Sequence, residues 1–296
     1  MNNYIETENL TKKYKITTAV DGVNLHAEAG TIYGLIGRNG AGKTTLLKLI
    51  AGLSVPTSGT VHYHTADGKR PRIGVLIEEP GLYYNLTARD NLEIKRIALN
   101  HKDIRETDEL IDFVGLSQYA DMKVRTYSLG MRQRLGIALA LVGDPDLLIL
   151  DEPVNGLDPQ GIREVRLMLE KLKRQGKTIL ISSHLLEELS KIADQFGIME
   201  RGQLIREATE EDLLKSLPGY IRLMADPLDE AKKVLESMNI FSYQTKGACL
   251  LHIQEQLDRS NEILKNMVNA GIRVTECRVV HDSLETYFID ATKEEL

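Results

Sequence analysis

The stretch GRNGAGKTT, Gly37–Thr45, determines the fold that we expect for this chain. The residues that fill the pattern G-x-x-x-x-G-K-[ST] are Gly37, Gly42, Lys43 and Thr44. A short apolar run, Thr31–Ile36 (TIYGLI), precedes it and is typical of a buried strand, while Lys43–Ala51 (KTTLLKLIA) follows with helical spacing. This order of strand, glycine-rich loop and helix predicts a phosphate-binding loop within an α/β domain.

The chemistry of this loop points to a nucleoside triphosphate. Backbone N–H groups and the helix N-terminus converge on one place, and glycine lets the backbone approach the phosphates closely. Lys43 adds a positive charge for the β- and γ-phosphates, and the Thr44 hydroxyl can ligate Mg²⁺. A chance glycine-rich turn is the alternative, and both flanks argue against it. The residues expected to hold ATP are Gly37, Arg38, Asn39, Gly40, Ala41, Gly42, Lys43, Thr44 and Thr45.

The bulk composition is that of an ordinary soluble globular protein. Of 296 residues, 42% are hydrophobic and 27% charged, and the net charge of −6 gives no electrostatic reason to expect nucleic acid as a partner. The two cysteines, Cys249 and Cys277, lie far apart, which favours a reducing cytoplasm. The N-terminal residues lack the apolar core of a secretion signal, and no apolar run approaches the roughly 20 residues of a membrane span. We therefore expect any membrane role to depend on another polypeptide.

The pattern along the chain predicts two domains, at 1–217 and 218–296. In the first, a helical insertion is expected at about 86–143, and Leu147–Leu150 and Thr178–Ser182 are expected as strands of a parallel βαβ unit. The other expected elements of this domain are the strands Tyr4–Thr7, Val20–Ala27, Thr60–His64 and Arg72–Ile77 and the helices Asn91–Ala98, Ile104–Val114, Met131–Val142 and Pro159–Gln175. The second domain reads as strand, helix, one or two strands, helix and strand, which fits a small α+β unit of the split βαβ kind.

A second part of the site is expected where the hydrophobic stretch LLILDE, Leu147–Glu152, ends in two carboxylates. At the strand end, Asp151 would hold the Mg²⁺ that accompanies the nucleotide, directly or through water. One residue later, Glu152 is placed to polarise the attacking water. A solvated Asp-Glu turn is the alternative, and the upstream glycine-rich loop argues against it.

Before this strand the chain reads YSLGM, Tyr127–Met131, followed by RQRLGIALA. The order resembles the ATP-binding subunit of ABC transporters, in which an LSGGQ element opens a helix some twenty residues before the acidic strand. Ser128 and Gly130 match the serine and the second glycine of that element, whereas Leu129 and Met131 depart from it. The resemblance implies that this helix start binds the γ-phosphate of ATP presented by another subunit. A plain serine helix cap is the alternative.

Three further positions match the same family, and the matches together cover nearly all of residues 1–217. Tyr14, in KKYK, resembles the aromatic residue that stacks on adenine, with an ordinary surface tyrosine as the alternative. Asp158 ends NGLD, Asn155–Asp158, which resembles the loop that crosses the dimer interface. His184, in ISSH, resembles the switch histidine that contacts the γ-phosphate. The resemblance implies an α/β fold of the P-loop NTPase class, with an antiparallel β subdomain beside the ABC ATPase core.

One position departs from the family in an informative way. Glu78 stands where the family has a glutamine that touches Mg²⁺ and water, and Glu79 lies beside it. A carboxylate there is expected to bind Mg²⁺ more firmly while crowding negative charge near the γ-phosphate, so Glu78 counts among both the catalytic and the metal-binding candidates. Together with YSLGM it resembles the bacitracin-resistance and lantibiotic-immunity branch; a neutral replacement is the alternative. The resemblance also implies that Pro80–Asn91, with Tyr83 and Tyr84, docks against a permease; packing of these aromatic residues against the helical insertion is the alternative.

These matches imply an ATP-hydrolysing subunit that powers a separate integral membrane permease from the cytoplasmic face of the cell membrane. The working form would be a homodimer with ATP and Mg²⁺ at its interface, and the expected cargo is a lantibiotic or bacitracin-type antibiotic. The alternatives are an ABC-2 type exporter of another substrate, a soluble ABC ATPase acting on ribosomes or DNA, and a nucleotide sensor without turnover. The single ATPase unit and acidic balance argue against the ribosome- or DNA-directed ATPase, and the intact Asp151, Glu152 and His184 argue against the sensor.

Overall fold

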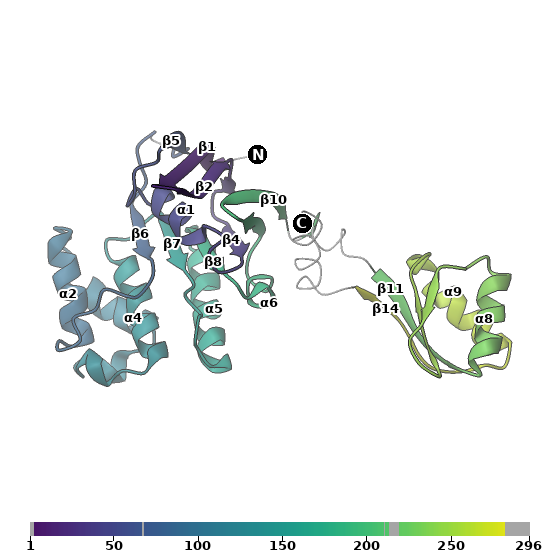
Figure 1. Cartoon of the computed structure of the whole chain (residues 1–296). Helices are drawn as coiled ribbons and strands as arrows, with labels where there is room; N and C mark the ends of the chain where they lie inside the picture. Colours follow the sequence, from purple (N-terminus) through teal and green to yellow (C-terminus); the bar gives the residue numbers. More distant parts are fainter. Residues whose placement is uncertain (1–2, 67, 210, 213–218, 282–296) are drawn as a thin grey trace. The chain divides into compact units, whose positions relative to one another are not determined.

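The computed structural model describes residues 3–66, 68–209, 211–212 and 219–281. Contacts within the chain divide it into two compact units, Met1–Asp212 and Leu213–Leu296, here called the core unit and the C-terminal unit. Figure 1 shows the elements of each, and the expected domain boundary at 217/218 falls outside the described residues. None of the helices in the described part of the chain has the length and hydropathy of a membrane span.

The core unit is built on a six-stranded sheet in the order β10-β9-β4-β8-β7-β6. The strands are β4 (Ile32–Gly37), β6 (Ile73–Leu76), β7 (Leu147–Asp151), β8 (Thr178–Ser183), β9 (Gln195–Glu200) and β10 (Gln203–Thr209). All pairs are parallel except β9 with β10. Every residue of β4, β7 and β8 is buried, as expected for strands covered on both faces, which explains their continuous apolar runs.

The parallel register brings the carboxyl ends of five strands to one edge of this sheet. Leu76 of β6 pairs with Leu150 of β7, and Asp151 pairs with Ser182 of β8. Helix α1 (Lys43–Ile50) follows β4 at this edge, and α5 (Pro159–Arg174) and the short α6 (Leu186–Leu189) follow β7 and β8. The residues that carry the chemistry therefore come from loops that leave the same edge.

A second, antiparallel sheet contains β1 (Asn3–Tyr14), β2 (Thr17–Val23), β3 (His26–Glu28) and β5 (Ser58–Tyr63), with the other three strands all paired to β1. The single strand expected over Val20–Ala27 is wrong, because the chain forms β2 and β3 there. The two strands pair with different parts of β1, and the break lies where Asn24 accepts a hydrogen bond from the N–H of Asn9.

The helical insertion is confirmed as a compact layer, in which α2 and α4 stand beside the core sheet in Figure 1. It contains α2 (Ala88–Ala98), α3 (Glu106–Phe113), α4 (Leu129–Leu141) and the short 3₁₀ turns η1 (Ser117–Tyr119) and η2 (Val124–Thr126). A capping box starts α2: Thr87 accepts from the N–H of Asp90, and the Asp90 carboxylate accepts from the N–H of Thr87. Apolar side chains from all three helices form the core of this layer.

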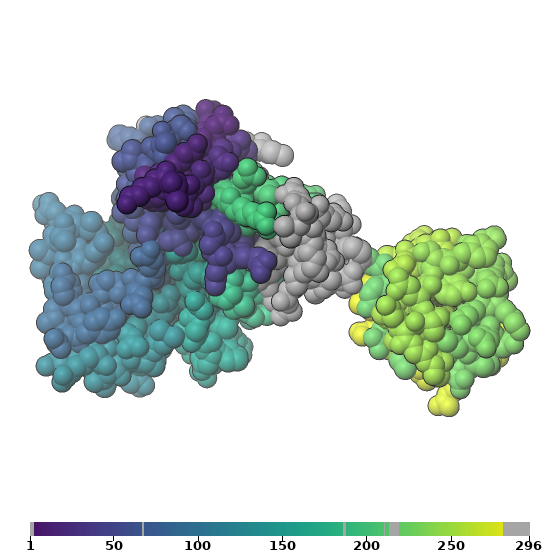
Figure 2. Space-filling model, in the orientation of Figure 1, coloured from purple at the N-terminus to yellow at the C-terminus, as the bar shows by residue number. Residues whose placement is uncertain are grey.

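The C-terminal unit has the expected β-α-β-β-α-β order, and its residues form one rounded body in Figure 2. Its elements are β11 (Gly219–Asp226), α8 (Leu228–Ser237), β12 (Tyr243–Thr245), β13 (Leu250–Ile253), η3 (Leu257–Arg259), α9 (Ser260–Asn269) and β14 (Arg273–His281). The four strands form an antiparallel sheet in the order β12-β13-β11-β14. Leu235 of α8 and Ile263 of α9 pack with Leu223 of β11 in a buried apolar core of its own.

Candidate active site

The glycine-rich loop connects β4 to α1 as expected, and Lys43 is the first residue of the helix. Gly42, the N-cap, has a φ of 103°, and a Cβ at this position would lie 2.2 Å from the carbonyl oxygen of Ala19. The Lys43 side chain is 6% exposed, and its Nζ donates to the carbonyl of Gly37 at 2.6 Å. The lysine ammonium therefore lies within the loop, where the oxygens of a polyphosphate can replace the carbonyl as its partner.

A hydroxyl–carboxylate cluster joins the phosphate loop to the end of β7. The Asp151 carboxylate is buried and accepts from two hydroxyls, that of Thr44 at 2.7 Å and that of Ser182 at 2.5 Å. Carboxylate and hydroxyl oxygens are the hard donors that Mg²⁺ prefers, and Mg²⁺ in such sites takes its remaining ligands from water and phosphates. Thr44 and Asp151 therefore fit the expected metal-binding role.

Glu152 lies between the phosphate-loop lysine and the expected switch histidine. One carboxylate oxygen is 3.3 Å from Nζ of Lys43, and the other is 2.8 Å from Nδ1 of His184. The backbone N–H of Glu152 donates to the Ser182 hydroxyl at 3.0 Å, and its φ of 49° is left-handed. The structure thus joins Lys43, Glu152 and His184, three residues that the sequence analysis selected from three separate motifs.

Sequence reasoning missed Ser182, which orients both acidic residues of this site. It is the first of two serines at the end of the strand TILISS, Thr178–Ser183. A hydroxyl at that position is only a weak sequence signal of a functional residue. Its partner Asp151 becomes evident only when β7 and β8 are paired, because the two residues are register partners on adjacent strands.

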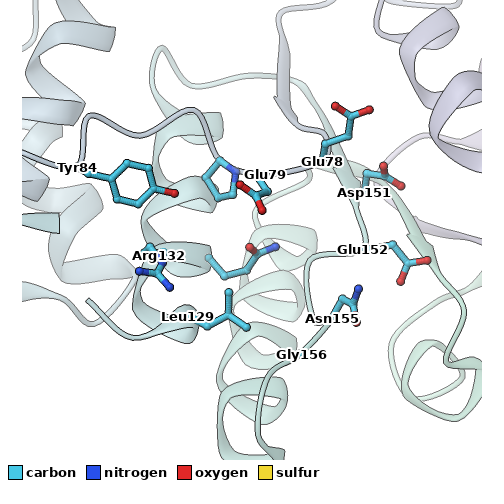
Figure 3. A pocket seen from close by; sticks show the side chains of 11 residues that line it. Glu78, Glu79, Tyr84, Leu129, Arg132, Asp151, Glu152, Asn155 and Gly156 are labelled. Atoms are coloured by element: carbon cyan, nitrogen blue, oxygen red, sulfur yellow. The ribbon is translucent and has the colours of Figure 1, made fainter. Parts of the chain in front are cut away.

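Glu78 lies at the same edge of the sheet as Asp151 and Glu152, where it pairs with a lysine of α1. Its carboxylate pairs with Nζ of Lys48 at 2.6 Å and is 65% exposed, and its backbone is left-handed, with a φ of 62°. A cavity of about 650 Å³ lies at this edge of the sheet, and its lining includes Glu78, Glu79, Arg132, Asp151 and Glu152. In Figure 3 the Glu79 side chain points toward the centre of this cavity, whereas the Glu78 carboxylate points away from it. The metal-binding and catalytic role of Glu78 stays a prediction.

The YSLGM segment opens α4, which begins at Leu129, two residues before the expected start. Ser128 is the N-cap, and its hydroxyl accepts from the N–H of Met131 at 3.2 Å, so the plain capping role is present. The preceding Tyr127 is buried and donates to the carbonyl of Tyr119 at 2.6 Å, which anchors the segment; burial raises the pKa of Tyr127. The nucleotide-binding role of Ser128 remains a prediction.

A second cavity, of about 430 Å³, is lined by Ser128 and Gly130 together with Gly156 and Asp158. Asp158 caps α5 by accepting from the N–H of Gly161 at 3.0 Å. The structure therefore brings together two elements that the sequence analysis connected only through the family resemblance.

Tyr14 ends β1 and is 48% exposed, with Nζ of Lys12 5.1 Å from the centre of its ring. It pairs with Thr17 at the start of β2, and Ala19 of the same strand approaches the phosphate loop at Gly42. An exposed ring on this hairpin is compatible with stacking on an adenine, which stays a prediction.

Comparison with known proteins gives consistent matches. The ABC transporter family matches residues 20–155. The bacitracin transport ATP-binding protein BcrA of Enterococcus faecalis is 41% identical over 295 residues, which cover 97% of this chain and 96% of BcrA. The lantibiotic transport ATP-binding protein SrtF of Streptococcus pyogenes is 43% identical over 206 residues, which cover 69% of this chain and 90% of SrtF.

Among solved structures, the chain is similar to the dimeric post-hydrolysis state of the ATP-binding cassette MJ0796 bound to ADP and Pi. The TM-score is 0.63 with 26% identity, over 70% of this chain and 98% of that one. The fold, the linked Lys43–Glu152–His184 site and the match to BcrA over almost the whole chain agree. The chain belongs to the ABC transporter family, as an ATP-binding subunit that hydrolyses ATP.

Proposed function

We propose that this chain powers an exporter of antimicrobial peptides of the bacitracin or lantibiotic kind, through an integral membrane permease on a separate chain. The observation that carries the proposal is the match to a bacitracin transport ATP-binding protein over 97% of the chain, which includes the C-terminal unit. The lantibiotic transport protein SrtF supports the same class of cargo. Through its permease the subunit would act at the cytoplasmic face of the membrane.

The working form is a dimer in which two copies complete each nucleotide site. Within one copy, Asp151 and Glu152 line one cavity, while Ser128 and Gly130 line another. ATP bound on the phosphate loop of one copy would present its γ-phosphate to the Ser128 helix start of the second copy. The similarity to a dimeric cassette bound to ADP and Pi supports this arrangement.

The residues of one copy divide the work of hydrolysis. The Lys43 ammonium moves from the Gly37 carbonyl to the phosphates and neutralises part of their charge. Glu152, released from Lys43, orients and polarises the attacking water, and His184 holds the other oxygen of that carboxylate. Mg²⁺, held by Thr44 and Asp151, would supply charge neutralisation at the phosphates.

An apolar groove provides a surface for the permease. A cavity of about 350 Å³ lies between the segment after β6 and helices α2 and α4, and its apolar lining includes Leu53, Ile77, Pro80, Tyr83, Ile94 and Leu139. Tyr83 and Tyr84 are exposed beside it, and aromatic residues are enriched at interfaces. The lining also includes Leu76 at the end of β6 and Glu79, so a helix seated in the groove would contact the loop that carries Glu78 and Glu79.

Two experiments test the proposal. The Glu152→Gln variant keeps the nucleotide-binding residues but loses the water-polarising carboxylate, so we expect ATP to hold it as a stable dimer, measured by size exclusion with light scattering. A monomer that persists with saturating ATP would count against the two-copy site. In cells that express the chain with its permease, we expect bacitracin or lantibiotic resistance that Glu152→Gln abolishes. Equal sensitivity with and without the wild-type pair would remove the proposed cargo.

A further inference from the structure

Helix α1 carries two lysines, and each pairs with a glutamate in the loop that follows a strand of the core sheet. Lys43 contacts Glu152, which lies two residues after Leu150 of β7. Lys48, five residues later on α1, contacts Glu78, which lies two residues after Leu76 of β6. Since Leu76 and Leu150 are register partners, the two glutamates occupy matching places on adjacent strands.

The backbone conformation of Glu78 indicates that the Lys48–Glu78 pair is a specific part of the fold. Glu78 and Glu152 both have left-handed backbones, with φ values of 62° and 49°, a conformation that is uncommon for residues other than glycine. Such strained residues concentrate at functional sites, where the surrounding structure holds them. On α1, Lys48 lies one turn beyond Thr44, so the helix face that presents the Thr44 hydroxyl to Asp151 also presents the Lys48 ammonium to Glu78.

The charges explain why Glu78 needs a partner. Glu78, Glu79, Asp151 and Glu152 line one cavity, and a triphosphate bound on the adjacent loop adds further negative charge. Like charges gathered around one cavity oppose binding of the nucleotide. Lys48 neutralises one of the four carboxylates and, by pairing with it, directs it away from the centre of the cavity (Figure 3).

We propose that Lys48 is a positioning residue for ATP hydrolysis, which acts by holding Glu78 away from the Mg²⁺·ATP site. This proposal takes the place of the metal-binding role that the sequence predicted for Glu78. This inference rests on the ATPase activity in the proposed function and is independent of its cargo. Without Lys48, the Glu78 carboxylate turns toward the phosphates and the cation. The affinity for ATP then falls because of charge repulsion, while the requirement for free Mg²⁺ falls because a further carboxylate attracts the cation.

The test is a double-mutant cycle of Lys48→Met and Glu78→Gln in the full chain, with steady-state ATPase kinetics as the readout. For Lys48→Met we expect the KM for ATP to rise about threefold, the size appropriate to a partly exposed ion pair. The free Mg²⁺ concentration that gives half-maximal activity should fall about twofold by the same argument. In the Glu78→Gln background, Lys48→Met should change neither value, because the neutral amide needs no cation.

Two controls separate positioning from general damage. Lys48→Arg keeps the charge and should restore both values, and Lys233→Met, which breaks the Lys233–Glu230 pair of the C-terminal unit, should leave them unchanged. Equilibrium binding of ATP as a function of Mg²⁺ concentration gives a second readout that does not need turnover. The inference is overturned if Lys48→Met has the same effect with Glu78 and with Gln at position 78, or no effect with Glu78. A wild-type chain without any ATPase activity would instead contradict the proposed function.

Discussion

Ser182→Ala tests whether the buried Ser182 hydroxyl, which belongs to none of the sequence motifs, holds Asp151 and Glu152 in place. The change removes the hydrogen bond donated to Asp151 at 2.5 Å and the one accepted from the N–H of Glu152 at 3.0 Å. Asp151 keeps its bond from Thr44. A hydrogen bond to a charged group contributes about 1.5–3 kcal/mol, so we expect the free energy of unfolding of the core unit to fall by about that amount.

The same change should also weaken catalysis, by a free energy similar to the loss of stability. Losing a hydrogen bond to a carboxylate that ligates a metal commonly costs about 10- to 100-fold in metal affinity or activity, and we expect kcat/KM for Mg²⁺·ATP to fall within that range. Urea unfolding followed by far-ultraviolet circular dichroism measures the change in the free energy of unfolding. ATPase titrations against Mg²⁺ measure the change in kcat/KM.

Thr178→Val provides a matched control for Ser182→Ala, because it removes a buried hydroxyl at the opposite end of the same strand. The Thr178 hydroxyl accepts from the N–H of Gly30 at 3.0 Å, so its loss should cost about 1 kcal/mol and leave the Mg²⁺ dependence unchanged. The reasoning is refuted if Ser182→Ala alters the Mg²⁺ dependence no more than Thr178→Val does.

Three further predictions concern the loop, the helical insertion and the C-terminal unit. Gly42→Ala should abolish ATP binding, measured by titration calorimetry, because the new Cβ would lie 2.2 Å from the carbonyl oxygen of Ala19. Gly40→Ala has open space around it, so it should lower the free energy of unfolding by only about 1–2 kcal/mol, the cost of its left-handed φ. Asp90→Ala removes half of the capping box of α2, so it should lower the free energy of unfolding by about 1 kcal/mol at pH 7. Hydrogen bonds from Thr87 hold the pKa of Asp90 below its ordinary value. The difference in the free energy of unfolding between the wild type and Asp90→Ala should be complete above about pH 4. It should vanish as the pH falls through the lowered pKa of Asp90 in the folded state, as measured by urea unfolding at a series of pH values. A difference that stays constant down to pH 2 contradicts the prediction. Leu223→Ala should cost about 2–5 kcal/mol and lower only the calorimetric transition of the C-terminal unit, whereas a shift of both transitions would show that the two units unfold together.

Much of the fold and site could be predicted because it depends on local sequence. The phosphate loop follows from glycines between an apolar strand and a helix, and the acidic strand Leu147–Asp151 follows from a continuous apolar run. These patterns depend on the periodicity of side chains over a few residues, so most element bounds differ by only one to three residues from those expected. The strand over Val20–Ala27 failed because its break depends on how β1 pairs with two separate partners.

The amino-acid sequence alone was sufficient to select Lys43, Asp151 and Glu152, because each belongs to a motif with its own local signature, whereas His184 was selected through the family resemblance. Only the tertiary structure showed which other groups hold them. Ser182 reaches Asp151 across 31 residues of sequence, and Lys48 reaches Glu78 across 30. Both contacts are set by the register of parallel strands and by the helix that crosses their ends, and neither depends on neighbours along the chain. A pairing of that kind leaves no periodic trace in the residues, so it becomes visible only when the strands are placed side by side.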